Sequence, residues 1–511
     1  MERKTEAWIG LDVGTTGVRA IAYEADGTRI CGREAFYPLL TPAADRAEQD
    51  PQVIYGAVEQ VVREAAEELA VRGYRLEGVA LSTVMHSFLP LDERKEPLTY
   101  MQTWADSRSA DIVRGLRGER SFCQSLYQRT GCPVHACYPF AKLLWLRQHA
   151  PELFRRMRYA GSIKDYLFRQ LTGEWVIDHS AASTSGLYNA RKMDWDEESL
   201  HYAGIRRASM PGLVQPTYQC GLQPAAAERL HMMPGTPVVI GATDGVLVNV
   251  GIGAVQPGQI STTIGTSGAM RMLVPEPRLD DAMRTWCYYL ADDIWVAGGA
   301  INNGGMVLRW LRDEVLGYEV RDGEDVYARM TQQASEVPAG SEGLLLLPFL
   351  TGERSPWWNS ELRGMFFGLS MKHGRPHMIR AAMEGICYSL NSVWKVLQDF
   401  GGIRDLRVSG SFTKSPFWLQ MLADILEQPL VLPDNSEGAA FGAAALGFLA
   451  GGRLSGVADT ASLVHPRKVY MPNPDTREVY RSLYDIFQRL YEKLPQEFAD
   501  IAAFQTKYAA R

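Results

Sequence analysis

The sequence is poor in cysteine, has no excess of basic residues and contains no long hydrophobic run. Its seven cysteines among 511 residues are odd in number and not densely spaced, which favours a reducing compartment over a disulfide framework, so we expect a cytoplasmic protein. A formal net charge of −6 argues against nucleic acid or an anionic membrane as a partner, because both favour a basic surface. The most apolar stretch, residues 439–450, is too short to span a bilayer and is rich in glycine and alanine, so it is predicted to be a closely packed helix.

Cysteines and histidines at the spacing of metal ligands are also few. Cys132, His135 and Cys137 lie close together in the sequence, but no second cluster follows at zinc-finger spacing, so we expect no metal there.

The chain does have 46% hydrophobic and 22% charged residues, which is the composition of a globular protein. A chain of this length is too long for one ordinary core, so two large domains are expected. The sequence leaves the oligomeric state open, with a homodimer as one alternative.

Two short loops share one pattern. Residues 12–17 read Asp-Val-Gly-Thr-Thr-Gly and residues 263–268 read Thr-Ile-Gly-Thr-Ser-Gly, each after a strand-like run. The glycines allow a tight turn in which backbone N–H groups approach an anion, and the hydroxyls add further donors. One such loop is weak support for phosphate binding, since most are plain turns, but the repetition strengthens it. The pattern predicts two related halves that face one nucleotide.

The order of elements around each loop predicts α/β domains. Strand-like runs at 7–13 and 18–23 flank the first loop, followed by a helix from Asp50-Pro51 to about residue 71 and a strand at 76–82. The second loop has strands at 259–264 and 269–273 around it and a later strand at 406–409. We place one domain at 1–250 and the other at 251–511, sharing a cleft because no long linker separates them. Helical apolar spacing from Asp475 onward predicts a long docking helix.

Several residues near these loops suit phosphoryl transfer. A strand at 238–240 leads into Asp244, where a carboxylate among glycines would approach a hydroxyl and accept its proton; the alternative is an Asx turn or helix cap. Asp12 precedes the first loop and would orient Mg²⁺ through water or position the phosphates, whereas the second loop has Thr263 at that point. This asymmetry suggests that only one of the two halves, the one with Asp12, faces the metal. Arg19 either adds positive charge toward the phosphates or is a surface arginine.

Longer segments resemble signatures of the FGGY family of carbohydrate kinases. Residues 364–369 and 377–384 fit the family's C-terminal signature throughout. The N-terminal signature departs at Cys137, where the family usually has an aromatic residue, Met, Gly or Ser, and fits at Pro139, Lys142, Leu143, Trp145, Leu146 and Gln148. The resemblance extends from Ile9 to about Leu449. Within the family the chain is most similar to the gluconokinases, in segments 103–109, 244–247, 263–269 and 302–310.

The resemblance implies two actin-like ATPase (ribonuclease H-like) domains, with ATP and sugar in the cleft between them, and Asp244 as the catalytic base. The residues that it implies for ATP and Mg²⁺ are Asp12, Thr15, Thr16 and Arg19 at the first loop, Gly265 and Thr266 at the second, Gly305 and Arg309 beneath the nucleotide, and Gly410 and Ser411 at the adenosine turn. Among these, Asp12 is the implied metal contact. The residues that it implies for the sugar are Met85, His86, Trp104, Asp106, Asp244 and Gly245.

The physical chemistry of these side chains agrees with such roles. Trp104 offers a flat face to the C–H groups of a polyol, and His86 and Asp106 are able to hydrogen-bond its hydroxyls. A sugar acid also needs a cation or several donors at its carboxylate, for which His86, Arg108 and Lys164 are the candidates. Lys164 does not discriminate, because the segment 164–166 also resembles one in xylulokinases.

The sequence thus predicts an enzyme that phosphorylates D-gluconate at its C6 hydroxyl with ATP, giving 6-phospho-D-gluconate and ADP. One alternative is a kinase of a related sugar such as xylulose or another ketose, because most of the motifs serve ATP. A second alternative, of another class, is a non-catalytic actin-like ATP-binding protein. Asp244 and both signatures weigh against the second.

Overall fold

The computed structural model describes residues 5–319, 323–435 and 437–508. The chain forms two compact units. Unit 1 comprises Met1–Gln256, Leu273–Ala297 and Glu437–His465, and unit 2 comprises Pro257–Met272, Gly298–Ser436 and Pro466–Arg511. Each unit therefore combines segments that are far apart in the sequence, and the boundary at 250/251 stays a prediction.

The main sheet of unit 1 has the strand order β13-β14-β5-β1-β2-β3. Strands β1 and β2 form an antiparallel hairpin around the first loop, and β5 lies parallel to β1 on its other side. The bounds are β1 Glu6–Val13, β2 Gly17–Tyr23, β3 Arg29–Phe36, β5 Arg75–Thr83, β13 Gln219–Gly221 and β14 Pro237–Thr243. The predicted strands at 7–13, 18–23, 76–82 and 238–240 are confirmed.

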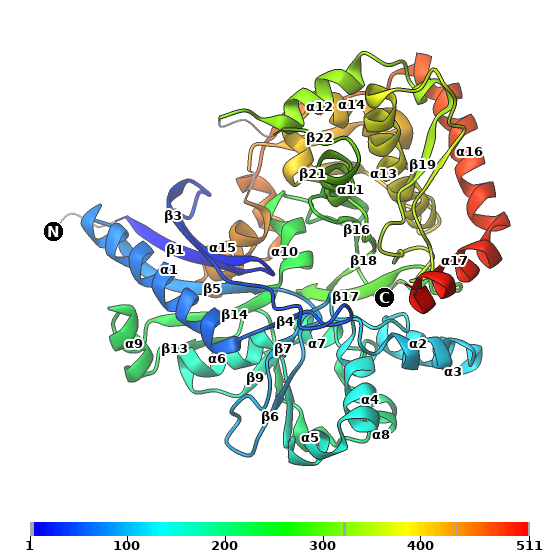
Figure 1. Ribbon diagram of the computed structural model, residues 1–511. Coiled ribbons are helices and arrows are strands. Elements are labelled where there is room, and N and C mark those ends of the chain that lie inside the picture. Colours follow the sequence, from blue (N-terminus) through cyan, green and yellow to red (C-terminus); the bar gives the residue numbers. More distant parts are fainter. Residues whose placement is uncertain (1–4, 320–322, 436, 509–511) are drawn as a thin grey trace. The chain divides into compact units, whose positions relative to one another are not determined.

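Helices α1 (Pro51–Val71) and α15 (Gly438–Ala450) cover opposite faces of this sheet. Successive side chains of a strand point to opposite faces, and Ile9 and Leu11 of β1 share a buried cluster with Val58 of α1. On the other face, a Cβ at Gly10 would lie 1.9 Å from the Ala440 carbonyl oxygen of α15. Glycine therefore allows α15 to approach the sheet closely, and the predicted packed helix at 439–450 is confirmed (Figure 1).

Asp50 starts α1 as the residue pattern predicts, since its side chain accepts a hydrogen bond from the Gln52 N–H and Pro51 stands at the first helical position. The remaining helices of unit 1 are α2 Ala110–Arg117, α3 Arg120–Thr130, α4 Pro139–His149, α5 Pro151–Arg156, α6 Ile163–Thr172, α7 His179–Ser183, α8 Glu197–Ala203, α9 Pro224–Leu230 and α10 Asp244–Gly251. The short strands are β4 Glu48–Gln49, β6 Leu89–Leu91, β7 Met101–Gln102, β8 Tyr159–Gly161, β9 Val176–Asp178, β10 Tyr188–Asn189, β11 Asp194–Trp195, β12 Gly212–Val214 and β17 Trp286–Ala291, and β18 (Ile294–Ile301) runs from unit 1 into unit 2.

Unit 2 repeats the hairpin arrangement. Strands β15 and β16 form an antiparallel hairpin around the second loop, and β21 lies parallel to β15. Strands β22 and β23 continue the order β16-β15-β21-β22-β23. The bounds are β15 Gln259–Ile264, β16 Gly268–Val274, β21 Asp405–Ser409, β22 Leu430–Pro433 and β23 Pro466–Tyr470. The predicted strands of this half are confirmed.

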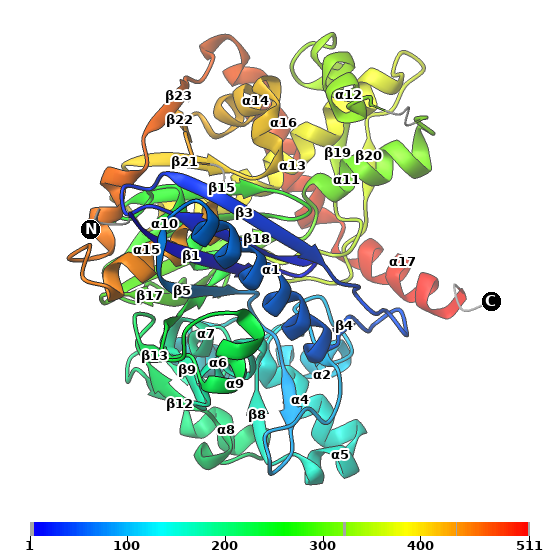
Figure 2. The same ribbon diagram turned by 90° about the vertical axis from the view of Figure 1, so that its left-hand side faces the viewer.

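The centre of unit 2 is α13 (Arg375–Gln398), which is buried along most of its length and packs against α12 and α14 (Figure 2). The predicted C-terminal docking helix is α16 (Arg477–Lys493), whose buried residues are Tyr480, Tyr484 and Phe487. The other elements are α11 Gly305–Trp310, α12 Val326–Ser335, α14 Pro416–Leu426, α17 Pro495–Tyr508, β19 Leu345–Leu347 and β20 Met365–Phe367. Within the described residues, no helix has the length and apolar character needed to cross a membrane.

Candidate active site

The first loop is anchored through its carbonyl groups. The Tyr37 hydroxyl lies 2.6 Å from the Gly14 carbonyl oxygen and 3.1 Å from that of Gly17. The Gln49 side chain donates to the Thr15 carbonyl at 2.7 Å. In the described part of the chain, no acceptor pairs with the backbone N–H groups of Thr15 and Thr16. The loop therefore offers donors to an anion while its acceptors are occupied.

Asp12 lies at the end of β1 beside this loop. Its carboxylate is buried, accepts a hydrogen bond from the Ser82 hydroxyl at 3.0 Å, and pairs with Arg19 at 3.3 Å. Arg19 is half-exposed and also pairs with Glu437 at 3.3 Å. Burial raises the pKa of Asp12, and the Arg19 charge acts in the opposite direction. A cation beside this carboxylate would offset the cost of its burial, so the site fits a hard metal ion with oxygen ligands.

The second loop is anchored differently, by the start of α11. The Gly305 N–H donates to the Gly265 carbonyl at 2.7 Å, and the Met306 N–H donates to the Thr266 carbonyl at 3.2 Å. A Cβ at Gly304 would lie 2.6 Å from the Ser267 carbonyl oxygen. The glycines thus let the helix start lie directly against the loop.

A cavity of about 660 Å³ opens beside the second loop, entirely within unit 2. Five of the residues predicted for the nucleotide line it: Gly265, Thr266, Gly305, Arg309 and Ser411. The volume is in the range of cavities that bind cofactors and other small molecules. Gly410 adjoins it with a left-handed φ of 98°, and a Cβ there would lie 2.4 Å from the Ile264 carbonyl oxygen. The structure therefore brings these six residues together.

Several lining residues of this cavity carry no signal in the sequence. They are contributed by α12, by the turn after Ser411 and by the start of α14, and include Tyr327, Lys414, Phe417 and Trp418. Their side chains meet only because α12 and α14 come together in the folded unit.

Asp244 is the first residue of α10, directly after β14, and is half-buried. Its carboxylate accepts a hydrogen bond from the Gly245 N–H at 2.7 Å. Beyond the effect of burial, the charges of Asp12 and Asp244 both raise the pKa of the Tyr37 hydroxyl. Both carboxylates therefore lie near the tyrosine that anchors the first loop. Asp244 thus occupies a helix start at the same edge of the sheet as the first loop, because Thr243 of β14 and Val13 of β1 both pair with Thr83 of β5.

His86 follows Met85 in the turn after β5 and has a left-handed φ of 60°. Its Nδ1 lies 2.7 Å from the Thr184 carbonyl oxygen, so this nitrogen carries a proton. The ring meets Tyr138 edge-on. Backbone strain in a buried polar residue marks a position that the surrounding structure holds in place.

The Trp104 indole N–H donates to the Thr15 hydroxyl at 3.0 Å, so a predicted sugar residue contacts the first loop. Asp106 is expected to hydrogen-bond the sugar, but its carboxylate is occupied within the protein. It is 1% exposed, and both carboxylate oxygens accept hydrogen bonds from Arg108, at 2.7 and 2.8 Å, while one also accepts from the Ala47 N–H at 2.9 Å. In this geometry Asp106 supports the segment that carries Trp104, and a direct sugar contact stays a prediction.

Two of the candidates for a substrate carboxylate are occupied within the protein. Arg108 is paired with Asp106 and Glu48, and the fully buried Lys164 donates to three backbone carbonyls. The geometry therefore argues against Arg108 and Lys164 as carboxylate ligands, because their donors are already used within the protein. The sequence does not reveal this burial. His86 remains as the candidate.

Cys132 points its thiol at the Ser183 carbonyl, and His135 accepts from the Cys137 N–H. In the portion of the chain that the structure describes, no group of three or more His, Cys, Asp or Glu residues is arranged to hold a metal ion.

Comparison with known proteins identifies the fold. Residues 7–251 match the N-terminal domain and residues 260–451 the C-terminal domain of the FGGY family of carbohydrate kinases. The chain belongs to this family. The FGGY protein is therefore a carbohydrate kinase, a phosphotransferase that uses ATP, and the predicted fold of two actin-like domains is confirmed.

The chain is similar along nearly its whole length to members of this family. It is 38% identical to the gluconokinase of Bacillus subtilis (strain 168), over 98% of both chains. The crystal structure of gluconate kinase from Lactobacillus acidophilus superimposes with a TM-score of 0.91 at 30% identity, covering 98% of this chain and all of that one. The ligand-bound xylulose kinase of the same organism gives 0.90 at 30% identity, covering 97% and 100%. The fold alone thus does not separate the two substrates.

Proposed function

We propose that this kinase transfers the γ-phosphoryl group of ATP to the C6 hydroxyl of D-gluconate, giving 6-phospho-D-gluconate and ADP. The placement of Asp244 at the start of α10, near Asp12 and the first loop, carries the mechanism. The 38% identity to a gluconokinase supports the substrate. The alternative is xylulose or another ketose, supported by the similarity to a xylulose kinase at 30% identity.

In the proposed mechanism Asp244 accepts the proton of the sugar hydroxyl as its oxygen attacks the γ-phosphorus. The N–H groups of Thr15 and Thr16 and the hydroxyls of the first loop stabilise charge on the transferring group. Gly265, Thr266, Gly305, Arg309, Gly410 and Ser411 hold the nucleotide. Catalysis by this arrangement is mainly positioning and electrostatic stabilisation.

Mg²⁺ is proposed as the metal, held by Asp12 through water, and it would supply positive charge at the phosphates. Arg19 contributes further positive charge at the same carboxylate. On the sugar side, Met85, His86, Trp104 and Gly245 are proposed contacts, with Asp106 beneath them. We propose the sugar acid and ATP as partners, and neither nucleic acid nor a membrane. The proposed location is the cytoplasm. A homodimer is the proposed alternative to a monomer.

The test is a coupled ADP-release assay with Mg-ATP and a panel of gluconate, xylulose, ribulose and glycerol, with a control that lacks sugar. The proposal expects the highest kcat/KM for gluconate and only weak ATPase activity without sugar, because water is a poor acceptor at this site. A preference for a ketose would retain the kinase mechanism and overturn the substrate.

A further inference from the structure

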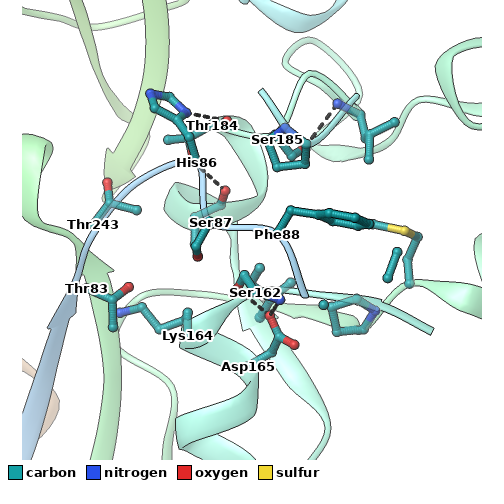
Figure 3. Close-up of a pocket in the computed structure, with 18 of the residues that line it drawn as sticks. Thr83, His86, Ser87, Phe88, Ser162, Lys164, Asp165, Thr184, Ser185 and Thr243 are labelled. Carbon is teal, nitrogen blue, oxygen red and sulfur yellow. Dashed lines mark hydrogen bonds between the residues drawn. The ribbon is translucent and has the colours of Figure 1, made fainter. Parts of the chain in front are cut away.

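Lys164 on α6 is completely buried, and its ammonium group lies at the junction of two strands. Its Nζ donates to the carbonyl oxygens of Ile240 at 2.7 Å and Ala242 at 3.0 Å in β14, and to that of Leu81 at 3.3 Å in β5. An ammonium has three donors, so these carbonyls use all of them. Figure 3 shows the side chain extending from α6 toward Thr83 at the end of β5.

Strand β14 is irregular at this place. Its register with β5 shifts between Val239 and Ala242, and Gly241 has a left-handed φ of 68°. A Cβ at Gly241 would lie 1.7 Å from the Leu81 carbonyl oxygen, so no other residue fits. The Gly241 N–H donates to the Pro216 carbonyl oxygen, which lies outside the β14–β5 ladder. Lys164 therefore supplies the donors that a regular ladder would have supplied.

The irregular segment leads directly to Asp244, which is two residues beyond Ala242. We propose that Lys164 is a positioning residue for Asp244, holding the end of β14 so that the carboxylate meets the sugar hydroxyl. This inference rests on the proposed function, in which Asp244 accepts the hydroxyl proton. It gives Lys164 a different role from the one for which it is a candidate by sequence, which is to bind the carboxylate of the substrate.

The charge state of Lys164 gives the proposal a pH signature. Burial lowers the pKa of Lys164 to about 8, against the charges of Asp178 and Asp244. Asp178 lies 3.8 Å from the ammonium, and Asp165, next on α6, turns its carboxyl to Ser162. Above this pKa the neutral amine has only two donors for three carbonyls, so kcat falls while the nucleotide site in unit 2 is unaffected.

This loss is distinct from unfolding. Between pH 8 and the ordinary lysine value of 10.5, the unfolded chain binds more protons at this residue than the native chain. The contribution of Lys164 to the free energy of unfolding therefore rises with pH through that window.

Lys142 on α4 is a matched control. It is equally buried, burial lowers its pKa to about 8, and its ammonium donates to the carbonyls of His86 and Thr103, each at 2.7 Å. These carbonyls belong to the segments of His86 and Trp104, which are proposed sugar contacts. Loss of Lys142 should therefore weaken sugar binding rather than slow the chemical step.

The experiment measures kcat and KM for gluconate and ATP in full-length Lys164→Met and Lys142→Met, with thermal unfolding of each. Lys164→Met should lower kcat about 100-fold, because a small misplacement of a catalytic group has that effect, with both KM values within about threefold. Lys142→Met should raise the gluconate KM about tenfold, as loss of a hydrogen-bonded anchor does. Unchanged kcat in Lys164→Met, or the same pattern in both variants, would overturn the inference.

Asp178→Asn decides the case if Lys164→Met does not fold. An Asn side-chain oxygen retains the cap on the Ala181 N–H, while the charge facing Lys164 is lost. The basic limb of the kcat–pH profile should move about one pH unit lower, and an unmoved limb would overturn the proposal. If wild type prefers another sugar, the proposed substrate fails and the same measurements are made with that sugar; if it phosphorylates none, both proposals fail.

Discussion

The two loops stand on the same hairpin scaffold but differ in charge. In unit 1, Asp12 of β1 lies opposite Ser82 of β5 and accepts its hydroxyl at 3.0 Å. In unit 2, the matching pair is Thr263 of β15 and Ser409 of β21, with their hydroxyl oxygens 2.9 Å apart. The first loop thus has a buried carboxylate beside it, and the second has a neutral hydroxyl pair. Under the proposed function, the repeat would supply donors to phosphate twice and a place for a cation once.

Their anchoring differs as well. The first loop is held by the side chains of Tyr37 and Gln49, and the second by the backbone at the start of α11. The first loop also accepts a hydrogen bond from Trp104 at Thr15, whereas the start of α11 joins the second loop to the cavity of unit 2. We infer that unit 1 carries the chemical step and unit 2 the nucleotide.

The sharpest test of this division is Asp244→Asn. Because the amide does not accept the hydroxyl proton, kcat should fall by at least about 1,000-fold. ATP binding, measured by calorimetry, should stay within about twofold, since the cavity lies in unit 2. Sugar phosphorylation at a near wild-type rate would show that Asp244 is not the base.

The asymmetry of the loops is tested by comparing Asp12→Asn with Thr263→Val. Asp12→Asn removes the only charge of the pair and should lower kcat about 100-fold and raise the Mg²⁺ concentration needed for half-maximal rate. Thr263→Val removes a neutral hydroxyl, with its contacts to Ser409 at 2.9 Å and Arg271 at 3.3 Å, and should change kcat no more than about tenfold. Steady-state rates over a Mg²⁺ titration give both values, and equal losses in the two variants would contradict the comparison.

Gly305→Ala tests the backbone anchor of the second loop. The added Cβ would lie 2.7 Å from the Gly265 carbonyl oxygen, so the helix start must move away, at a cost of about 1–3 kcal/mol. The ATP KM should rise about tenfold while the gluconate KM stays constant. Kinetics with each substrate varied in turn distinguish this result, and a change confined to the gluconate KM would refute it.

Tyr37→Phe tests the side-chain anchor of the first loop and should have the smallest effect. Loss of the hydroxyl leaves the Gly14 carbonyl without its 2.6 Å partner, which should lower the free energy of unfolding by about 1 kcal/mol. Because burial raises the pKa of Tyr37, the wild-type hydroxyl stays protonated and the difference should not depend on pH. Urea denaturation at pH 6 and pH 9 measures this, and a pH-dependent difference would argue against it.

Much of the fold followed from local sequence. Asp50-Pro51 specified the start of α1, glycine and alanine marked α15 as closely packed, and the apolar spacing after Asp475 specified α16. The loops were predicted for the same reason, since each needs glycine at fixed positions. Such features depend on neighbours in the chain, so a pattern of a few residues is sufficient to detect them.

Assignments that depended on burial were less secure. Lys164 and Arg108 are candidates for the substrate carboxylate by their charge, yet one donates to three backbone carbonyls and the other to two carboxylates. Tyr37 had no signal at all, because its hydroxyl reaches a loop more than twenty positions earlier. A sequence shows which charges exist but not which partners burial will give them.

The sequence by itself determined the family, the repeated glycine-rich loops predicted to bind phosphate, and the identity of the carboxylates at the strand ends. Each of these depends on a short run of neighbouring residues. Only the tertiary structure determined that Lys142 and Lys164 donate to the carbonyls of the segments proposed for the sugar and the base, and that α12 and α14 complete the cavity proposed for the nucleotide. The physical reason is that hydrogen bonds and cavities form between residues that are distant in the chain. Only folding determines which of those residues meet.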